Sequence, residues 1–169
     1  SMFEAMRDLP LKRESLGHDF FQGFFDNFNQ LCRVNVRRPK QDEVDIDNLS
    51  LVQNDELEES VAIETMAAKV MGSEVQALTH LSARISQLVQ RKVSNEDNPL
   101  SPKSLATAFL ESCTILGFEI KIKLIILKLF EKSVLDNIHT VYEDCNAHLI
   151  KEGVLPELKS TAPKRKPRT

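Results

Sequence analysis

The chain has 169 residues, a formal net charge of −3, an apolar fraction of 41% and a charged fraction of 28%. This length is enough for one domain whose core needs no disulfide or metal, and the composition is ordinary for a globular protein. The five glycines are spread along the chain, which argues against a glycine-rich phosphate loop and against a turn-rich β fold.

No apolar run approaches the roughly 20 residues that cross a bilayer, and the polar N-terminus carries no secretory signal. We therefore expect a cytoplasmic protein that makes no membrane contact. Cys32, Cys113 and Cys145 are far apart and form no CxxC pair, so we interpret them as free thiols rather than as a disulfide framework or a zinc site.

Residues 1–32 are predicted to form an N-terminal helical segment, in which Pro10 can start a helix. The apolar positions recur every three or four residues, which is the period of an amphipathic helix. They are Leu16, Phe20, Phe21, Phe24, Phe25, Phe28 and Leu31. A phenylalanine stripe at this spacing usually packs into a core. If the bundle left Phe24, Phe25 and Phe28 uncovered, they would mark a groove for a partner.

Residues 33–50 lose this periodicity and are predicted to form a charged linker loop, which is basic from Arg33 to Lys40 and acidic afterwards. Long loops in compact domains are functional or mobile. Arg33, Arg37 and Arg38 are therefore candidates for contacts with a ligand or with nucleic acid.

Arg33 and Arg37, followed by Asn48–Ser50, faintly resemble the RxxxR and D/NxSxxG elements with which PilZ domains bind cyclic dinucleotides. Two guanidinium groups would hold the phosphates of such a ligand. The spacing between the two elements is too short, however, Gln53 replaces the closing glycine, and no β-barrel is predicted. We do not favour this interpretation.

Residues 51–156 are predicted to form the helical bundle. Asn54 followed by the acidic run Asp55–Glu59 is typical of a helix start, because these side chains cap the helix and suit its positive end. A seam at coiled-coil spacing follows and ends before Pro99. This seam consists of Val75, Leu78, Leu81, Ile85 and Leu88. Ser101-Pro102 then predicts another helix start, and Gly117 predicts the end of that helix.

The last helix of the bundle, about residues 119–152, is predicted to be the longest. Its apolar side chains surround it almost completely, so we place it at the centre of the bundle. They are Leu124, Ile125, Leu127, Leu129 and Phe130, and a second narrow seam follows with Val134, Ile138, Val141, Cys145 and Leu149. Gly153 and Pro156 end this helix, and residues 157–169 are predicted to form a disordered basic tail or interdomain linker.

The fold class is therefore predicted to be all-α, a bundle of about four to five helices with a long central C-terminal helix. The four histidines show no metal-binding spacing, and the acidic run has no histidine beside it. We assign no catalytic, cofactor-binding or metal-binding residue and no small-molecule substrate. Nucleic acid is not expected as a partner, because the basic tail lacks aromatic residues and the acidic body would repel a polyanion.

Several stretches of the chain together resemble the N-terminal part of a bacterial family, domain of unknown function 1631. They are Phe3–Leu9, Leu49–Glu59, Asn98–Leu100, Lys128–Glu131 and Gly153–Pro156. The resemblance extends to about Leu158 and implies a longer protein, with linkers rich in proline and arginine after this region. It supplies no catalytic residues. Members are sometimes labelled thymidine phosphorylase, but neither a phosphate-binding loop nor an α/β pattern supports that label here.

We expect a helical protein–protein interaction or regulatory module of a larger cytoplasmic bacterial protein, with no enzymatic activity. Its partner would be another protein or a second copy in a homodimer, because the two seams can pack against each other or against another chain. The alternative is a module that senses a ligand such as a cyclic dinucleotide, or that binds nucleic acid, through the loop from Arg33 to Lys40 and the basic tail.

Overall fold

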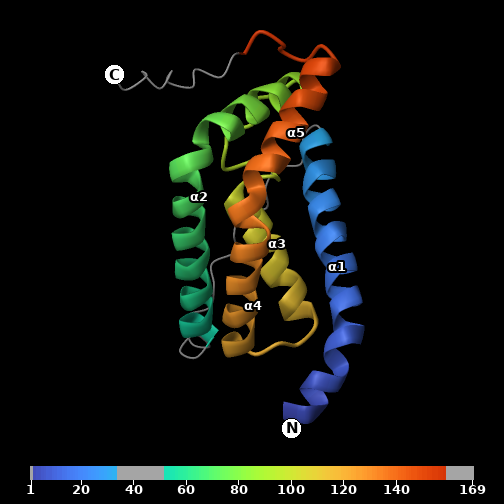
Figure 1. The fold of residues 1–169 in the computed structure, drawn as a ribbon, viewed down its shortest axis with the longest axis vertical. Coiled ribbons are helices and arrows are strands. Elements are labelled where there is room, and N and C mark those ends of the chain that lie inside the picture. The colour runs from blue at the N-terminus through green and yellow to red at the C-terminus, as the bar shows by residue number, and fades with distance from the viewer. Residues whose placement is uncertain (1, 34–51, 159–169) are drawn as a thin grey trace, which may run out of the picture.

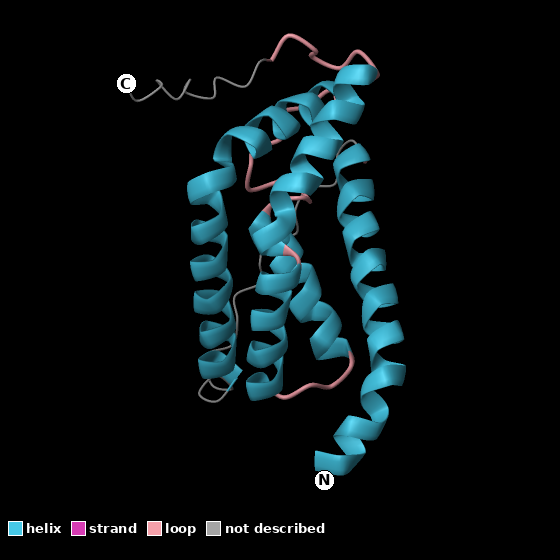
Figure 2. Cartoon of the chain, in the orientation of Figure 1, coloured by secondary structure: helices cyan, strands magenta, loops and turns pink. Residues whose placement is uncertain are grey.

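The computed structural model describes residues 2–33 and 52–158, and within them every regular element is a helix and none is a strand (Figures 1 and 2). The helices are α1 (Met2–Cys32), α2 (Val52–Val89), α3 (Pro102–Ile115), α4 (Ile120–Ser133), the 3₁₀ turn η2 (Leu135–Asn137) and α5 (Ile138–Lys151). The predicted all-α class is therefore confirmed. Arg37, Arg38 and the rest of the predicted linker lie outside the described residues, as does the tail from residue 159 onwards.

The helices pack side by side around one core. In Figure 1, α1 and α2 form the two flanks, α4 and α5 follow one another between them, and α3 lies behind. The core draws its buried side chains from every helix, and rings from three helices meet in it. Phe109 of α3 stacks on Phe130 of α4 with their centroids 4.4 Å apart. Phe20 of α1 meets both rings edge-on, at 6.2 Å and 5.8 Å.

The start and end of α3 agree with the sequence prediction. Ser101 is the N-cap residue, and its Oγ accepts a hydrogen bond from the backbone N–H of Ser104 at 3.1 Å. Pro102 occupies the first helical turn. Gly117 has a φ of +75°, a left-handed conformation that ends the helix and that a side chain would disfavour.

The helix boundaries differ from the prediction at three places. α2 begins at Val52, so Asn54 lies inside the helix instead of capping it. α1 continues through Pro10 instead of starting there. The expected single helix over residues 119–152 is two helices of 14 residues each, separated by η2. At the break, Asn137 Nδ2 donates to the Ser133 carbonyl at 3.2 Å, so a side chain takes an acceptor that a continuous helix would use. The longest helix is α2, with 38 residues.

The C-terminal segment lies between α1 and α2, but α4 is not buried on all sides. Only Leu127, Phe130 and Glu131 of α4 are buried, whereas Ile125 and Leu129 are exposed. A helix that is apolar on all sides needs only one face in the core, and here the other apolar face points outward.

The two predicted seams pack within the chain. Leu78, Leu81 and Ile85 of α2 are buried in the same core as Ile138 of α5. The outer positions of both seams, Val75, Leu88 and Val141, are exposed. Packing within one chain therefore explains the spacing of the apolar residues in both seams. The seams give no evidence that a second chain is bound.

Candidate interaction surface

The outer face of α4 carries an exposed apolar stripe. Ile122, Ile125 and Leu129 follow each other at spacings of three and four, which places them on one face of the helix. Their side chains are 40%, 64% and 58% exposed. In the view of Figure 1, α4 lies in front of α3 and between α1 and α2. We call these three residues the α4 stripe.

Lysines line one edge of the α4 stripe. Lys121, Lys128 and Lys132 are exposed, and Lys121 and Lys132 form no ion pair with any described residue. Glu131 is the one acidic residue of α4, and it is buried away from the stripe. Lys128 Nζ lies 3.0 Å from one of its carboxylate oxygens, and Lys69 Nζ of α2 lies 3.1 Å from the other.

These two lysines determine the state of Glu131. The hydrogen bond from Lys128 and, after it, the one from Lys69 lower the pKa of the Glu131 carboxyl group, although burial acts in the opposite direction. Glu131 is therefore ionised at neutral pH and forms ion pairs with both lysines. The outer face of α4 keeps a positive edge along one side of its apolar stripe.

The phenylalanines predicted as a partner groove divide into two groups. Phe24 and Phe28 are half-buried, with ring centroids 5.0 Å apart, and pack against the core. Phe25 is exposed, and Phe21, one turn before it, is exposed to the same degree. The exposed phenylalanines among the described side chains of α1 are thus Phe21 and Phe25, rather than the three predicted ones.

Arg33 follows the last residue of α1 and is exposed. It borders a groove of about 600 Å³ between α1, α3 and the connection before α3. Two more basic residues line this groove, but so do three acidic ones. The basic residues are Arg33, Arg91 and Lys103, and the acidic ones are Glu96, Asp97 and Glu111. The formal charges cancel, so the groove does not concentrate positive charge for a phosphate.

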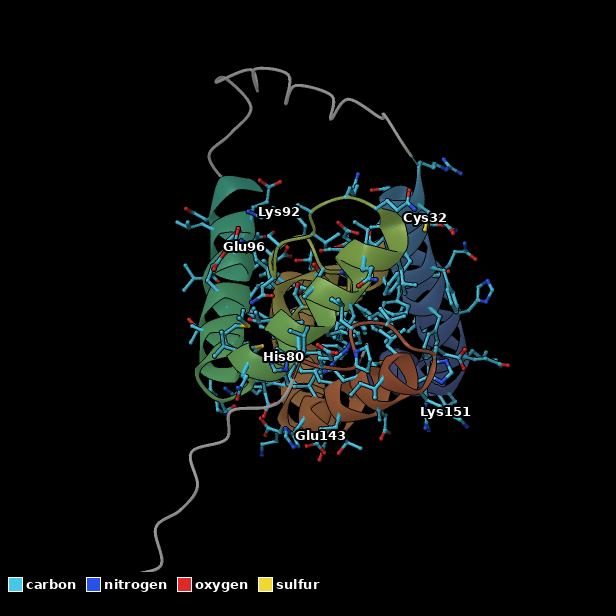
Figure 3. All side chains as sticks on the ribbon, turned by 90° about the horizontal axis from the view of Figure 1, so that it is seen from above. Cys32, His80, Lys92, Glu96, Glu143 and Lys151 are labelled. Carbon is cyan, nitrogen blue, oxygen red and sulfur yellow. The ribbon has the colours of Figure 1, made fainter. Side chains whose placement is uncertain are left out.

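His139 of α5 contacts a glutamate on each of two helices, α2 and α5. Its Nδ1 lies 2.8 Å from Glu74 Oε2 of α2, and its Nε2 lies 2.9 Å from Glu143 Oε1 of α5. The hydrogen bond to Glu74, and then the charges of both glutamates, raise the pKa of His139. In Figure 3, Glu143 lies at the rim of the bundle, as do Cys32 and Lys151.

The thiols and the metal-ligating side chains form no reactive group in the described residues. Burial raises the pKa of Cys113 to about 11, and it also raises the pKa of Cys145. Such thiols stay protonated at neutral pH and are poor nucleophiles. No three His, Cys, Asp or Glu side chains of residues 2–33 and 52–158 lie close enough together to hold a metal ion.

The α4 stripe is the feature that sequence reasoning missed. Ile125 and Leu129 were counted as core residues, because an all-round apolar helix is usually buried. The sequence does contain a sign of which side is exposed, since Lys121, Lys128 and Lys132 lie on the outward side of the helix and Leu127 and Phe130 lie opposite. Which apolar face would be covered depends on packing between helices that are distant in the sequence.

Comparisons with known proteins agree with the resemblance seen in the sequence motifs. No helix in the described part of the chain is long and apolar enough to cross a membrane. No curated protein and no solved structure matches the chain. One family model does match, over residues 1–153, and its description is "Protein of unknown function (DUF1631) N-terminal domain". Since the match covers most of the chain, this protein belongs to the DUF1631 family and contains that family's N-terminal domain.

Proposed function

We propose that this domain is a non-catalytic protein–protein interaction module of a larger cytoplasmic bacterial regulator, and that it binds its partner through the α4 stripe. The supporting observation is the exposure of Ile122, Ile125 and Leu129 on one face of a short helix. Contiguous apolar patches with a polar rim are typical of protein contact sites. Burying the exposed parts of these three side chains would contribute about 3 kcal/mol to binding.

The chemistry of the remaining residues supports a binding role over an enzymatic one. A nucleophilic cysteine needs a lowered pKa and a base beside it. Burial instead raises the pKa of both Cys113 and Cys145. His139 is held between two carboxylates, and its raised pKa favours the charged form that cannot act as a general base.

Binding of a cyclic dinucleotide or of nucleic acid is the less supported alternative. Of the arginines in that hypothesis, Arg33 lies in the described part of the chain. The groove beside it is lined by equal numbers of basic and acidic side chains. Polyanion binding depends on a net excess of positive charge that can replace counterions. The basic edge beside the α4 stripe has such an excess, but the stripe itself is apolar and offers no polar group to a phosphate.

Photo-crosslinking in cells tests the interaction function directly. A benzophenone amino acid placed at Ile125 should form a covalent adduct with a protein, because this side chain points away from the bundle. The matched control is the same amino acid at Thr140, an exposed position of α5. Adducts at position 125 that are absent at position 140 support the proposal. Equal yields at both positions, or no protein adduct at position 125, would refute it.

A further inference from the structure

A second apolar stripe lies on the outer face of α2. Leu57 and Val61, one turn apart, have side chains that are 63% and 58% exposed. The face of α2 that enters the core carries Ile63, Met66 and Val70 instead. We call Leu57 and Val61 the α2 stripe.

The α2 stripe has an acidic surround, in contrast to the α4 stripe. Asp55, Glu56 and Glu58 are exposed and form no ion pair with any described residue. The positive end of a helix explains acidic residues only in its first turn, and Glu56 and Glu58 lie beyond the first turn of α2, which contains Asp55. These two carboxylates therefore have no electrostatic partner among the described residues.

The chain already pairs these two helices once, within a single molecule. Glu59 of α2 and Lys123 of α4 form a half-buried salt bridge in the contact between the two helices. Lys69 and Glu131 form a second salt bridge farther along the same contact. The contact between α2 and α4 thus joins opposite charges beside apolar residues, with the acid on α2 in the first salt bridge and on α4 in the second.

On the basis of the interaction function proposed above, we infer that the occupant of the α4 stripe is a second copy of this chain, which contributes its α2 stripe. The apolar residues Leu57 and Val61 would cover Ile125 and Leu129 of the other copy. The unpaired Glu56 and Glu58 would then face the unpaired Lys121 and Lys132. Glu56 and Glu58 would thus each meet an opposite charge on the other copy.

The contact joins two different patches, so each copy has one patch left over after pairing. Contacts of this kind close into rings or continue into chains, whereas a contact between identical patches stops at a dimer. Wild-type protein should therefore form species larger than a dimer as its concentration rises. Added salt should weaken the association, because exposed charges are screened.

Two double variants and their mixture test the inference. Ile125→Asp with Leu129→Asp removes the α4 stripe, and Leu57→Asp with Val61→Asp removes the α2 stripe. All four side chains are exposed, so both variants should retain the fold, which circular dichroism checks. The measurement is sedimentation velocity of the 169-residue chain from about 10 µM to about 500 µM, a range in which weak association depends on concentration.

Each variant alone should sediment as a monomer. Their equimolar mixture should form a 1:1 pair and nothing larger, because it retains one intact α2 stripe and one intact α4 stripe. The matched control, Leu11→Asp with Leu88→Asp, changes exposed apolar residues elsewhere and should behave as wild type.

Three results would overturn the inference: a wild-type monomer at every concentration, normal association of either stripe variant, or a mixture that stays monomeric. The first result combined with a crosslink from position 125 to a different protein would reject self-association and keep the interaction function. The absence of any protein crosslink from position 125 would reject both self-association and the interaction function.

Discussion

Replacing Arg84 by alanine should destabilise this domain more than any surface substitution. The Arg84 side chain is 1% exposed, and all of its bonds go to neutral acceptors. Nε donates to the Val154 carbonyl at 3.2 Å, and Nη1 donates to Asn146 Oδ1 of α5 at 2.5 Å. Nη2 donates to the carbonyls of Leu155 and Leu158 at 3.2 Å and 3.4 Å. One α2 side chain thereby fixes the segment that follows α5.

The size of the effect follows from three contributions. Truncating a large buried side chain costs about 2–5 kcal/mol. Each acceptor left without a donor costs about 1–3 kcal/mol if it stays buried, although the loop carbonyls can regain water. In the opposite direction, the native state carries the cost of burying a charge that no carboxylate balances, and the variant recovers it. The net loss in the free energy of unfolding should be about 3 kcal/mol.

Urea denaturation followed by circular dichroism measures this loss. Arg84→Lys is the informative control, because it keeps the positive charge but cannot reach four acceptors from one nitrogen. It should lose about 2 kcal/mol, since the planar guanidinium rather than the charge holds the segment. A loss below about 1 kcal/mol for Arg84→Ala, or wild-type stability of Arg84→Lys, would show that these hydrogen bonds contribute little.

Three further outcomes are expected. The pKa of His139 is raised in the folded state, so its pairing with the glutamates stabilises the fold fully below the unfolded-state pKa of about 6.5 and no longer does so once the pH exceeds the folded-state pKa. His139→Gln should therefore lower the free energy of unfolding by about 0.5 kcal/mol near pH 5.5 and by less near pH 8.5 in urea titrations. Tyr142→Phe removes the 2.6 Å hydrogen bond that the Tyr142 hydroxyl donates to the Leu100 carbonyl and should cost about 1–2 kcal/mol by the same assay. In thiol labelling followed by mass spectrometry, exposed Cys32 should react at once and buried Cys113 only after unfolding, and equal rates would contradict the structure.

Local signals predicted much of this fold. The start of α3 at Ser101-Pro102 and its end at Gly117 depend on backbone chemistry that acts within a few residues, and the structure has both. The apolar period likewise identified α1 and α2 as helices. These features need no knowledge of which other helix lies nearby.

Features that depend on distant contacts could not be predicted in the same way. The exposure of Ile125 and Leu129 depends on which side of α4 the other helices occupy. The burial of Arg84 depends on the return of the segment after α5 to α2, 70 residues along the chain. An arginine on a helix is usually solvated, so no pattern around Arg84 distinguishes it from an ordinary surface residue.

Three of the five stretches that carry the family resemblance have a structural reason in the bundle. In Asn98–Leu100, the Asn98 amide is buried and donates to Ser82 Oγ at 3.0 Å, while the Leu100 carbonyl accepts from Tyr142. In Gly153–Pro156, the carbonyls of Val154 and Leu155 accept from Arg84. In the third stretch, Phe130 and Glu131 are buried.

Within Lys128–Glu131, one residue has no structural role in the bundle that explains it. Phe130 stacks on Phe109, Glu131 accepts from Lys69, and Lys128 pairs with Glu131. Leu129 is mostly exposed, and none of these internal bonds involves it. The exposed part of the Leu129 side chain adds no stability to the isolated bundle, since apolar surface contributes stability only when something covers it. Its presence is explained if the α4 stripe is covered in a complex, which is the condition that the crosslinking and mixing experiments examine.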